Sequence, residues 1–141
     1  MNEPSAKHST FVIERIYKHS PARAGQAAKA AWFPNAEEFD FRVGGREFNR
    51  GGPPGGPVYT FDARYQEIVP DQRIVYSYTL DMDDTRISVS VSTVEFKHAE
   101  VGTRLIYTEQ GVFLDGHDTP EQREHGTKAL LDRLGEALDG Q

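Results

Sequence analysis

Residues 119–138, TPEQREHGTKALLDRLGEAL, form the stretch that decides the fold. Thr119 is a suitable N-cap, Pro120 stands at the favoured first helical position, and Gln122 occupies the capping-box position three residues after the cap. Apolar side chains then recur at helical spacing on one face, at Leu130, Leu131, Leu134, Ala137 and Leu138. The sequence therefore predicts a long C-terminal helix with one face to bury.

The same helical face changes character along its length. Toward the N-terminus it continues through Thr127 and then through Arg123 or Glu124, all of them polar. The apolar half would seal a core, whereas the polar half would border a wet space. We therefore expect a pocket beside the N-terminal half of the helix, with Arg123 and Thr127 as candidate ligand-binding residues.

The chain before this helix has mostly the pattern of β-strands. β-branched and aromatic runs, or alternation of apolar with polar residues, predict strands at 10–17, 39–43, 46–50, 58–69, 73–80, 86–96 and 103–113. After the first strand, Ser20 and Pro21 mark a helix start. The alanine-rich segment 22–33 then predicts two short helices, divided at Gly25 and ended by Pro34.

Hairpin strands in succession, with the helices kept apart from them, are typical of an α+β domain. We expect a helix-grip fold, in which a curved antiparallel sheet of about seven strands wraps around the C-terminal helix. One domain would span residues 1–141, with 1–9 as a flexible tail.

Composition excludes several classes of function. The chain has 141 residues, no cysteine and a formal net charge of -6. The lack of cysteine excludes disulfides and thiolate chemistry and fits a cytoplasmic location. We expect no binding to nucleic acid or membranes, because an acidic chain without a basic stripe suits neither. The polar start shows no signal peptide, and no apolar run approaches the roughly 20 residues of a membrane span.

Several short stretches occur in a characteristic order: Arg15, 20–21, 32–33, 41–45, 65–76, and Gly126 with 130–134. In this order and spacing the chain resembles the START-like (SRPBCC) superfamily. The similar branch is the one related to the C-terminal domain of the heat-shock-protein-ninety ATPase activator. The resemblance implies a helix-grip fold whose members bind lipids, polyketides and other apolar molecules, and some of which are cyclases.

One position departs from that family. Many relatives carry a tryptophan directly after the glycine of the final helix, whereas this chain has Thr127 after Gly126. The comparison implies a wider pocket or a different mouth. The chain is too short for the extra N-terminal domain of the eukaryotic co-chaperone, so the resemblance does not carry that activity over.

Aromatic residues supply further candidates for the pocket wall. Tyr76 and Tyr78 share one face of their strand, Phe61 lies on the neighbouring strand, and Trp32 is the only tryptophan. Two interpretations remain open. These rings form either a structural core or a ligand-binding wall whose hydroxyls point inward.

Two further residues have alternative interpretations. Glu109 and Gln110 are adjacent in a strand, so one of them points inward. A buried Glu109 would be either paired with an arginine, the interpretation we favour, or a pocket residue acting as a general base. Gly126 would either pack closely on the sheet, the commoner case, or leave room for a ligand.

The sequence predicts no cofactor and no metal site. The five histidines show no metal-ligand spacing. The segment 81–84 begins like a calcium loop, but Arg86 and Ser92 stand where that loop needs glycine and an acid. The segment 51–57 lacks the lysine of a phosphate-binding loop and is expected to be a surface loop.

Three functions remain open at this point. The first, which we expect, is binding of a small apolar or aromatic ligand between the sheet and the last helix, by a monomer or homodimer. The second is an enzyme of the cyclase or hydrolase type that uses Glu109 with a tyrosine. The third is a protein-partner module, by analogy with the co-chaperone relatives.

Overall fold

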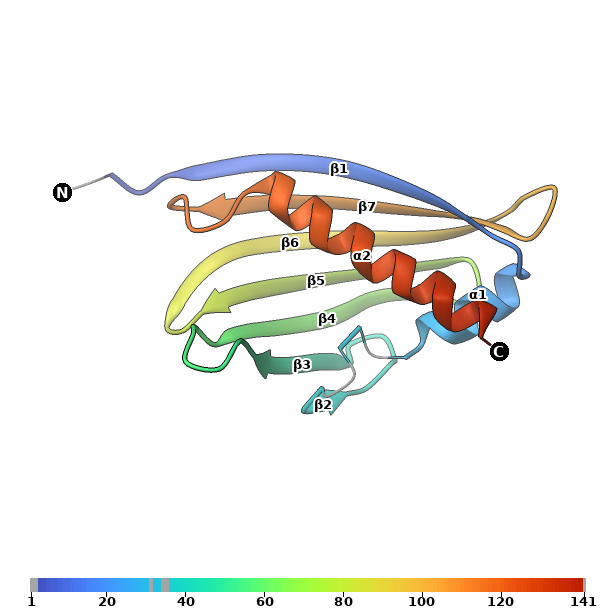
Figure 1. Cartoon of the computed structure of the whole chain (residues 1–141), viewed down its shortest axis with the longest axis horizontal. Coiled ribbons are helices and arrows are strands. Elements are labelled where there is room, and N and C mark those ends of the chain that lie inside the picture. Colours follow the sequence, from blue (N-terminus) through green and yellow to red (C-terminus); the bar gives the residue numbers. More distant parts are fainter. Residues whose placement is uncertain (1–2, 31, 34–35, 141) are drawn as a thin grey trace.

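The chain folds into one antiparallel sheet with a long helix lying across one of its faces (Figure 1). The computed structural model describes residues 3–30, 32–33 and 36–140. The elements are β1 (Ala6–Tyr17), α1 (Pro21–Ala28), β2 (Glu38–Phe39), β3 (Arg46–Gly51), β4 (Tyr59–Val69), β5 (Arg73–Met82), β6 (Thr85–His98), β7 (Thr103–Leu114) and α2 (Pro120–Asp139). The strand order is β1-β7-β6-β5-β4-β3-β2. The predicted seven-stranded α+β architecture with a C-terminal helix is confirmed.

One helix, not two, follows the first strand. Ser20 caps α1 as predicted, accepting a hydrogen bond from the amide of Arg23 at 3.2 Å. Gly25 lies inside α1 and does not divide it. A Cβ atom at Gly25 would lie 2.5 Å from Oδ1 of Asp71, so the glycine permits close packing on the β4–β5 turn.

The expected second helix is absent from the described residues between α1 and β2. The amide of Trp32 donates to Oε2 of Glu47 at 3.1 Å, instead of to a carbonyl of a preceding helical turn. The buried carboxylate of Glu47, on β3, therefore replaces a helical carbonyl as the acceptor for this amide. The predicted stop at Pro34 falls outside the described residues.

Two strand predictions also need correction. The first strand begins at Ala6 instead of Thr10, because β7 continues to Leu114 and pairs with it. Residues 6–9 thus belong to the sheet and not to a flexible tail. The strand expected at 39–43 is only Glu38–Phe39, because the chain turns at once, with the amide of Gly45 bonded to the carbonyl of Arg42.

The face of β6 that is turned toward the helix carries serines. Ser88, Ser90 and Ser92 are buried, whereas Val89 and Val91 are exposed on the outer face. Small polar residues therefore lie beneath the N-terminal half of α2, where larger apolar residues would fill the space. Further along the strand Val94 and Phe96 are buried and belong to the hydrophobic core.

The C-terminal half of α2 seals that core. Leu131, Leu134 and Leu138 are buried in it. The hydroxyl of Tyr17 donates to the carbonyl of Leu131 at 2.8 Å, which ties β1 to the helix. The apolar half of the helix therefore forms the fixed end of the sheet–helix contact, as its sequence pattern predicts.

The N-terminus of α2 is capped as predicted, with one difference. Oγ1 of Thr119 accepts a hydrogen bond from the amide of Gln122 at 3.1 Å. The amide of Thr119 itself donates to Oδ1 of Asp118 at 2.7 Å and not to Gln122. The side chain of Gln122 is thereby left available for the cavity beside the helix.

Candidate functional site

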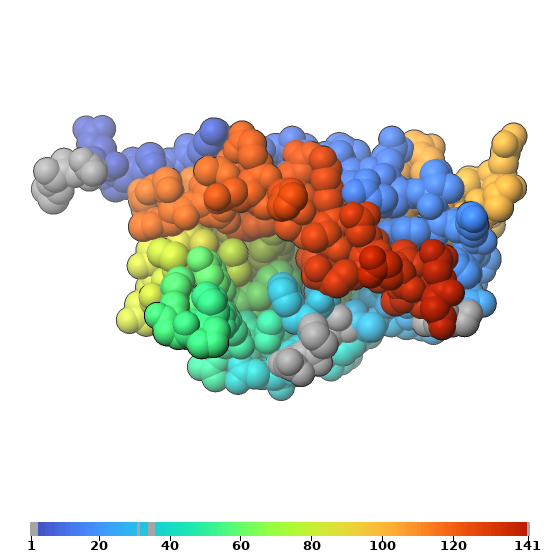
Figure 2. Space-filling model, viewed as in Figure 1, coloured from blue at the N-terminus to red at the C-terminus, as the bar shows by residue number. Residues whose placement is uncertain are grey.

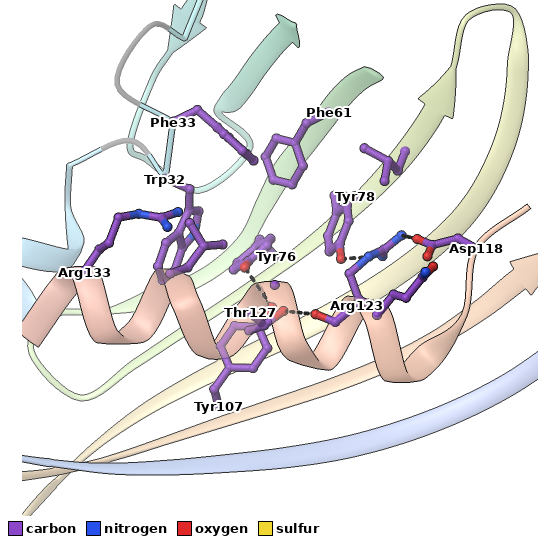
Figure 3. Close-up of a pocket in the computed structure, with 14 residues that line it drawn as sticks. Trp32, Phe33, Phe61, Tyr76, Tyr78, Tyr107, Asp118, Arg123, Thr127 and Arg133 are labelled. Carbon is purple, nitrogen blue, oxygen red and sulfur yellow. Dashed lines mark hydrogen bonds and ion pairs between the residues drawn. The ribbon is translucent and has the colours of Figure 1, made fainter. Parts of the chain in front are cut away.

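A cavity of about 280 Å³ lies between the inner face of the sheet and the N-terminal half of α2 (Figure 3). In Figure 2 this side of the molecule is hollowed between the orange-red α2 and the green segment that precedes β4. The residues that line the cavity come from the segment after α1, from β4, β5 and β7, from the loop between β7 and α2, and from α2. They are Trp32, Phe33, Phe61, Tyr76, Tyr78, Leu80, Tyr107, Asp118, Gln122, Arg123, Gly126, Thr127, Leu130 and Arg133.

Aromatic rings in mutual contact form the sheet side of the cavity. The ring centroids of Phe33 and Phe61 are 5.0 Å apart, and those of Phe61 and Tyr78 are 4.9 Å apart. Tyr76 continues the series, 6.0 Å from Tyr78. These distances lie in the range of favourable aromatic contacts, so the rings of the wall stabilise one another's positions.

A buried polar network lies behind this wall, centred on Glu109. Its carboxylate accepts hydrogen bonds from the hydroxyls of Tyr107 at 2.7 Å, Tyr78 at 2.9 Å and Ser92 at 3.2 Å. Nη1 of Arg123 lies 3.5 Å from Oε2 of the same carboxylate. The favoured prediction for a buried Glu109, pairing with an arginine, is thus confirmed, and this network compensates for the burial of the charge.

Burial raises the pKa of the Tyr78 and Tyr107 phenols well above their ordinary value, and the nearby Glu109 carboxylate adds to this rise. Both phenols therefore remain protonated donors at neutral pH. A phenol with so high a pKa does not release its proton readily, so these two hydroxyls are suited to holding Glu109 in place.

Arg123 connects the helix to this network. Its Nη1 donates to the hydroxyl of Tyr78 at 2.7 Å, and its Nη2 donates to Oγ of Ser88 at 2.7 Å and to Oδ2 of Asp118 at 3.0 Å. Two carboxylates thus flank one guanidinium, whose side chain is 10% exposed. The arginine is held in place by groups of the protein itself.

Glu47 is a second buried carboxylate, which the sequence pattern did not reveal. Its Oε1 accepts from the hydroxyl of Tyr65 at 3.0 Å, and its Oε2 accepts from the amide of Trp32. Among the described residues no cation forms an ion pair with it. Burial raises its pKa above the ordinary value of 4.5. Glu47 therefore anchors the segment that brings Trp32 and Phe33 to the cavity.

Phe48, the neighbour of Glu47 in β3, lies under two guanidinium groups, with the Arg46 carbon 4.2 Å and the Arg50 carbon 5.6 Å from its ring centroid. These cation–π contacts accommodate an aromatic ring on the outer face, and Glu47 takes the inward position.

The structure brings six of the seven candidate residues together. Those that line the cavity are Trp32, Phe61, Tyr76, Tyr78, Arg123 and Thr127. Glu109 does not line it, because the tyrosine hydroxyls and Ser92 stand around its carboxylate. Sequence reasoning missed Tyr107, although its position two residues before Glu109 puts both on one face of the strand.

The environment of Gly126 agrees with the less favoured of its two interpretations, in which the glycine leaves open space beside the helix. A Cβ atom at this position would meet no heavy atom within 4 Å, so close packing against the sheet is not the reason for the glycine. Gly126 lines the cavity instead. The mid-helix glycine and Thr127 together keep the helix side of the cavity open.

None of the helices in the part of the chain that the structure describes is both long and apolar enough to cross a bilayer. Within the same residues, no group of three or more His, Cys, Asp or Glu side chains is arranged to hold a metal ion.

Comparison with known proteins agrees with this architecture. The family model described as "Activator of Hsp90 ATPase homolog 1-like protein" matches residues 23–139. The chain belongs to this family. No curated protein matches it. Its membership confirms the resemblance to the START-like proteins.

Solved structures of family relatives cover nearly the whole chain. A crystal structure of a protein from Rhizobium loti is 45% identical, with a TM-score of 0.88, covering 94% of this chain and 98% of the other. An uncharacterized protein from Rhizobium leguminosarum is 39% identical, with a TM-score of 0.90, covering 99% and 100%. A protein from Chromobacterium violaceum is 25% identical, with a TM-score of 0.76, covering 92% and 96%.

Proposed function

We propose that this protein binds a small apolar or aromatic molecule in the cavity beneath the N-terminal half of α2. The observation that carries the proposal is a cavity of about 280 Å³ whose sheet side is a continuous series of aromatic rings. Small-molecule sites in proteins are typically concave and largely apolar, with a few polar groups that set orientation. The cavity fits this description.

The polar network supports binding over catalysis. A general base needs a free lone pair within hydrogen-bond reach of its substrate. Glu109 accepts three hydroxyl donors, faces Arg123 and does not line the cavity. These contacts are those of a structural carboxylate, which holds the tyrosines of the wall in fixed positions.

An aromatic probe tests the proposal directly. N-phenyl-1-naphthylamine is uncharged, and its fluorescence rises in apolar surroundings, so a titration reports entry into the cavity. Saturable binding at one site is expected for the wild-type chain. Gly126→Leu should weaken it by at least about tenfold, because the new side chain would occupy the space that Gly126 leaves open.

A matched variant controls for the added leucine. Lys128→Leu places the same side chain two residues along α2, at an exposed position that does not line the cavity. It should bind the probe like the wild type. The proposal fails if wild-type protein gives no saturable signal, or if the two leucine variants weaken binding equally.

A further inference from the structure

The hydroxyl protons of the cavity wall can be assigned one by one. A tyrosine or serine hydroxyl has a single proton to donate, and an ionised carboxylate only accepts. Glu109, paired with Arg123, accepts from Tyr78 and from Tyr107. The only proton of each of these two phenols is therefore committed to Glu109.

This commitment fixes the direction of the next hydrogen bond. The hydroxyls of Tyr76 and Tyr107 are 3.1 Å apart. Tyr107 has no second proton, so Tyr76 must be the donor. Ser92 also lies near the Tyr76 hydroxyl, but its one proton already faces Tyr107 at 2.8 Å and Glu109 at 3.2 Å. The Tyr76 oxygen thus keeps at least one unused lone pair.

The other two phenols of the wall each already accept a hydrogen bond from the protein. The Tyr78 oxygen accepts from Arg123 at 2.7 Å while donating to Glu109. The Tyr107 oxygen receives the proton of Tyr76 and faces Ser92. Among the described tyrosines that line the cavity, Tyr76 alone accepts no hydrogen bond from the protein under this assignment.

Thr127, on the helix side of the cavity, also has a hydroxyl oxygen that can accept a hydrogen bond. Its hydroxyl donates to the carbonyl of Arg123 at 2.9 Å, one turn earlier in α2, so its proton is also used within the protein. No described group donates to its oxygen. Figure 3 shows Thr127 and Tyr76 among the labelled side chains around one cavity, from the helix and from the sheet.

The cation at the same end of the cavity is already paired within the protein. Arg123 is flanked by Glu109 and Asp118, with nitrogen–oxygen distances of 3.5 and 3.0 Å. Arg123 therefore requires no anionic group from a ligand that lies near Tyr76 and Thr127. What the ligand must supply is a hydrogen-bond donor for the hydroxyl oxygens of Tyr76 and Thr127.

We propose that the ligand is an uncharged aromatic molecule carrying a hydroxyl or N–H donor, and that the oxygens of Tyr76 and Thr127 accept this hydrogen bond. This inference rests on the proposed binding function and adds the polarity of recognition to it. A buried acceptor left without a donor is penalised. Aromatic molecules that offer only acceptors are consequently discriminated against.

The test compares two ligands of nearly equal size, 1-naphthol and 1-methylnaphthalene, by displacement of N-phenyl-1-naphthylamine. The first carries a hydroxyl donor where the second has a methyl group. The measured quantity is the ratio of their dissociation constants, compared between the wild type and the variants Tyr76→Phe and Thr127→Val. Taking this ratio cancels general changes in cavity size or stability.

We expect Tyr76→Phe to reduce the preference for 1-naphthol by about threefold to tenfold, the usual value of one hydrogen bond. Thr127→Val should reduce it in the same direction. Tyr17→Phe removes a buried hydroxyl outside the cavity and should leave the ratio unchanged. In Tyr107→Phe the hydroxyl of Tyr76 loses its acceptor and can donate to a ligand. The acceptor-only ligand 1-methoxynaphthalene should therefore gain affinity relative to 1-naphthol.

The outcomes separate the two proposals. If the probe and both naphthalenes bind but the ratio is the same in wild type, Tyr76→Phe and Thr127→Val, the donor requirement is overturned while the binding function stands. If neither the probe nor a naphthalene binds, the binding function itself fails, and the donor requirement fails with it. A wild-type preference for 1-methoxynaphthalene over 1-naphthol overturns the inference even where a variant does not fold.

Discussion

The guanidinium of Arg123 on α2 lies 3.5 Å from the carboxylate of Glu109 on β7, and the two side chains are only 10% and 1% exposed. This pair joins the helix to the sheet at the cavity end, whereas leucines join them at the other end. A cavity under a helix needs such a contact, because the space itself supplies no packing. The ion pair therefore supports the open part of the fold.

Arg123→Met should lower the free energy of unfolding by about 3–5 kcal/mol, because Glu109 would stay buried without its cation. Glu109→Gln should cost less, since Arg123 would keep Asp118 as a partner. Urea unfolding of the two variants at pH 7 measures both effects. A loss for Arg123→Met below about 1 kcal/mol would show that the pair does not support the helix.

The two glycines inside α2 should respond differently to alanine. Gly126→Ala should raise the free energy of unfolding by about 1 kcal/mol, because the glycine penalty disappears and the new methyl group meets nothing within 4 Å. Gly135→Ala removes the same penalty, but its Cβ would lie 3.0 Å from the Tyr17 ring. Thermal and urea unfolding should rank Gly126→Ala above the wild type and Gly135→Ala below Gly126→Ala. Equal gains would contradict this packing.

Glu47→Gln should become more stable relative to the wild type as pH rises. Burial raises the pKa of Glu47 in the folded state above 4.5, so the folded protein holds this proton more tightly than the unfolded chain. The stability from this protonation is complete below pH 4.5 and is lost as pH rises through the folded-state pKa. Glutamine does not titrate, so the difference between variant and wild type should increase over that window.

Urea unfolding at a series of pH values measures this difference. Glu121→Gln, at an exposed position in the first turn of α2, controls for the loss of one negative charge. A difference between Glu47→Gln and wild type that stays constant, or that decreases with pH, would be inconsistent with a buried and unpaired Glu47.

Tyr17→Phe should lower the free energy of unfolding by about 1 kcal/mol, the usual net contribution of one buried hydrogen bond. The lost bond is the one from the Tyr17 hydroxyl to the carbonyl of Leu131. Probe binding should be unaffected, since Tyr17 lies outside the cavity. Calorimetry measures the loss of stability, and the fluorescence titration measures probe binding. Weaker probe binding would show that the leucine-packed end of the sheet–helix contact is coupled to the cavity end.

Local signals explain which features were readable in the sequence. The N-cap at Thr119 and the leucines of α2 depend only on neighbours within a few residues, and both were predicted correctly. The inward position of Arg123 and Thr127 follows from the same helical periodicity. The pairing of Glu109 with an arginine was favoured because a buried carboxylate is unfavourable alone, although the sequence did not say which arginine.

The remaining features depend on contacts between distant segments. The segment after α1 is rich in alanine, yet the helix does not continue into it. The amide of Trp32 donates its hydrogen bond to Glu47 on β3 instead of to a helical carbonyl. The face of β6 that turns inward carries serines, and alternation alone cannot choose between two faces. By itself, the sequence determined the order of the seven strands, the long C-terminal helix and the polarity of α2, but not the number of short helices after β1. Only the tertiary structure decided which strand faces meet the helix, and with them the cavity, because strand register is set by pairing partners far away in the chain.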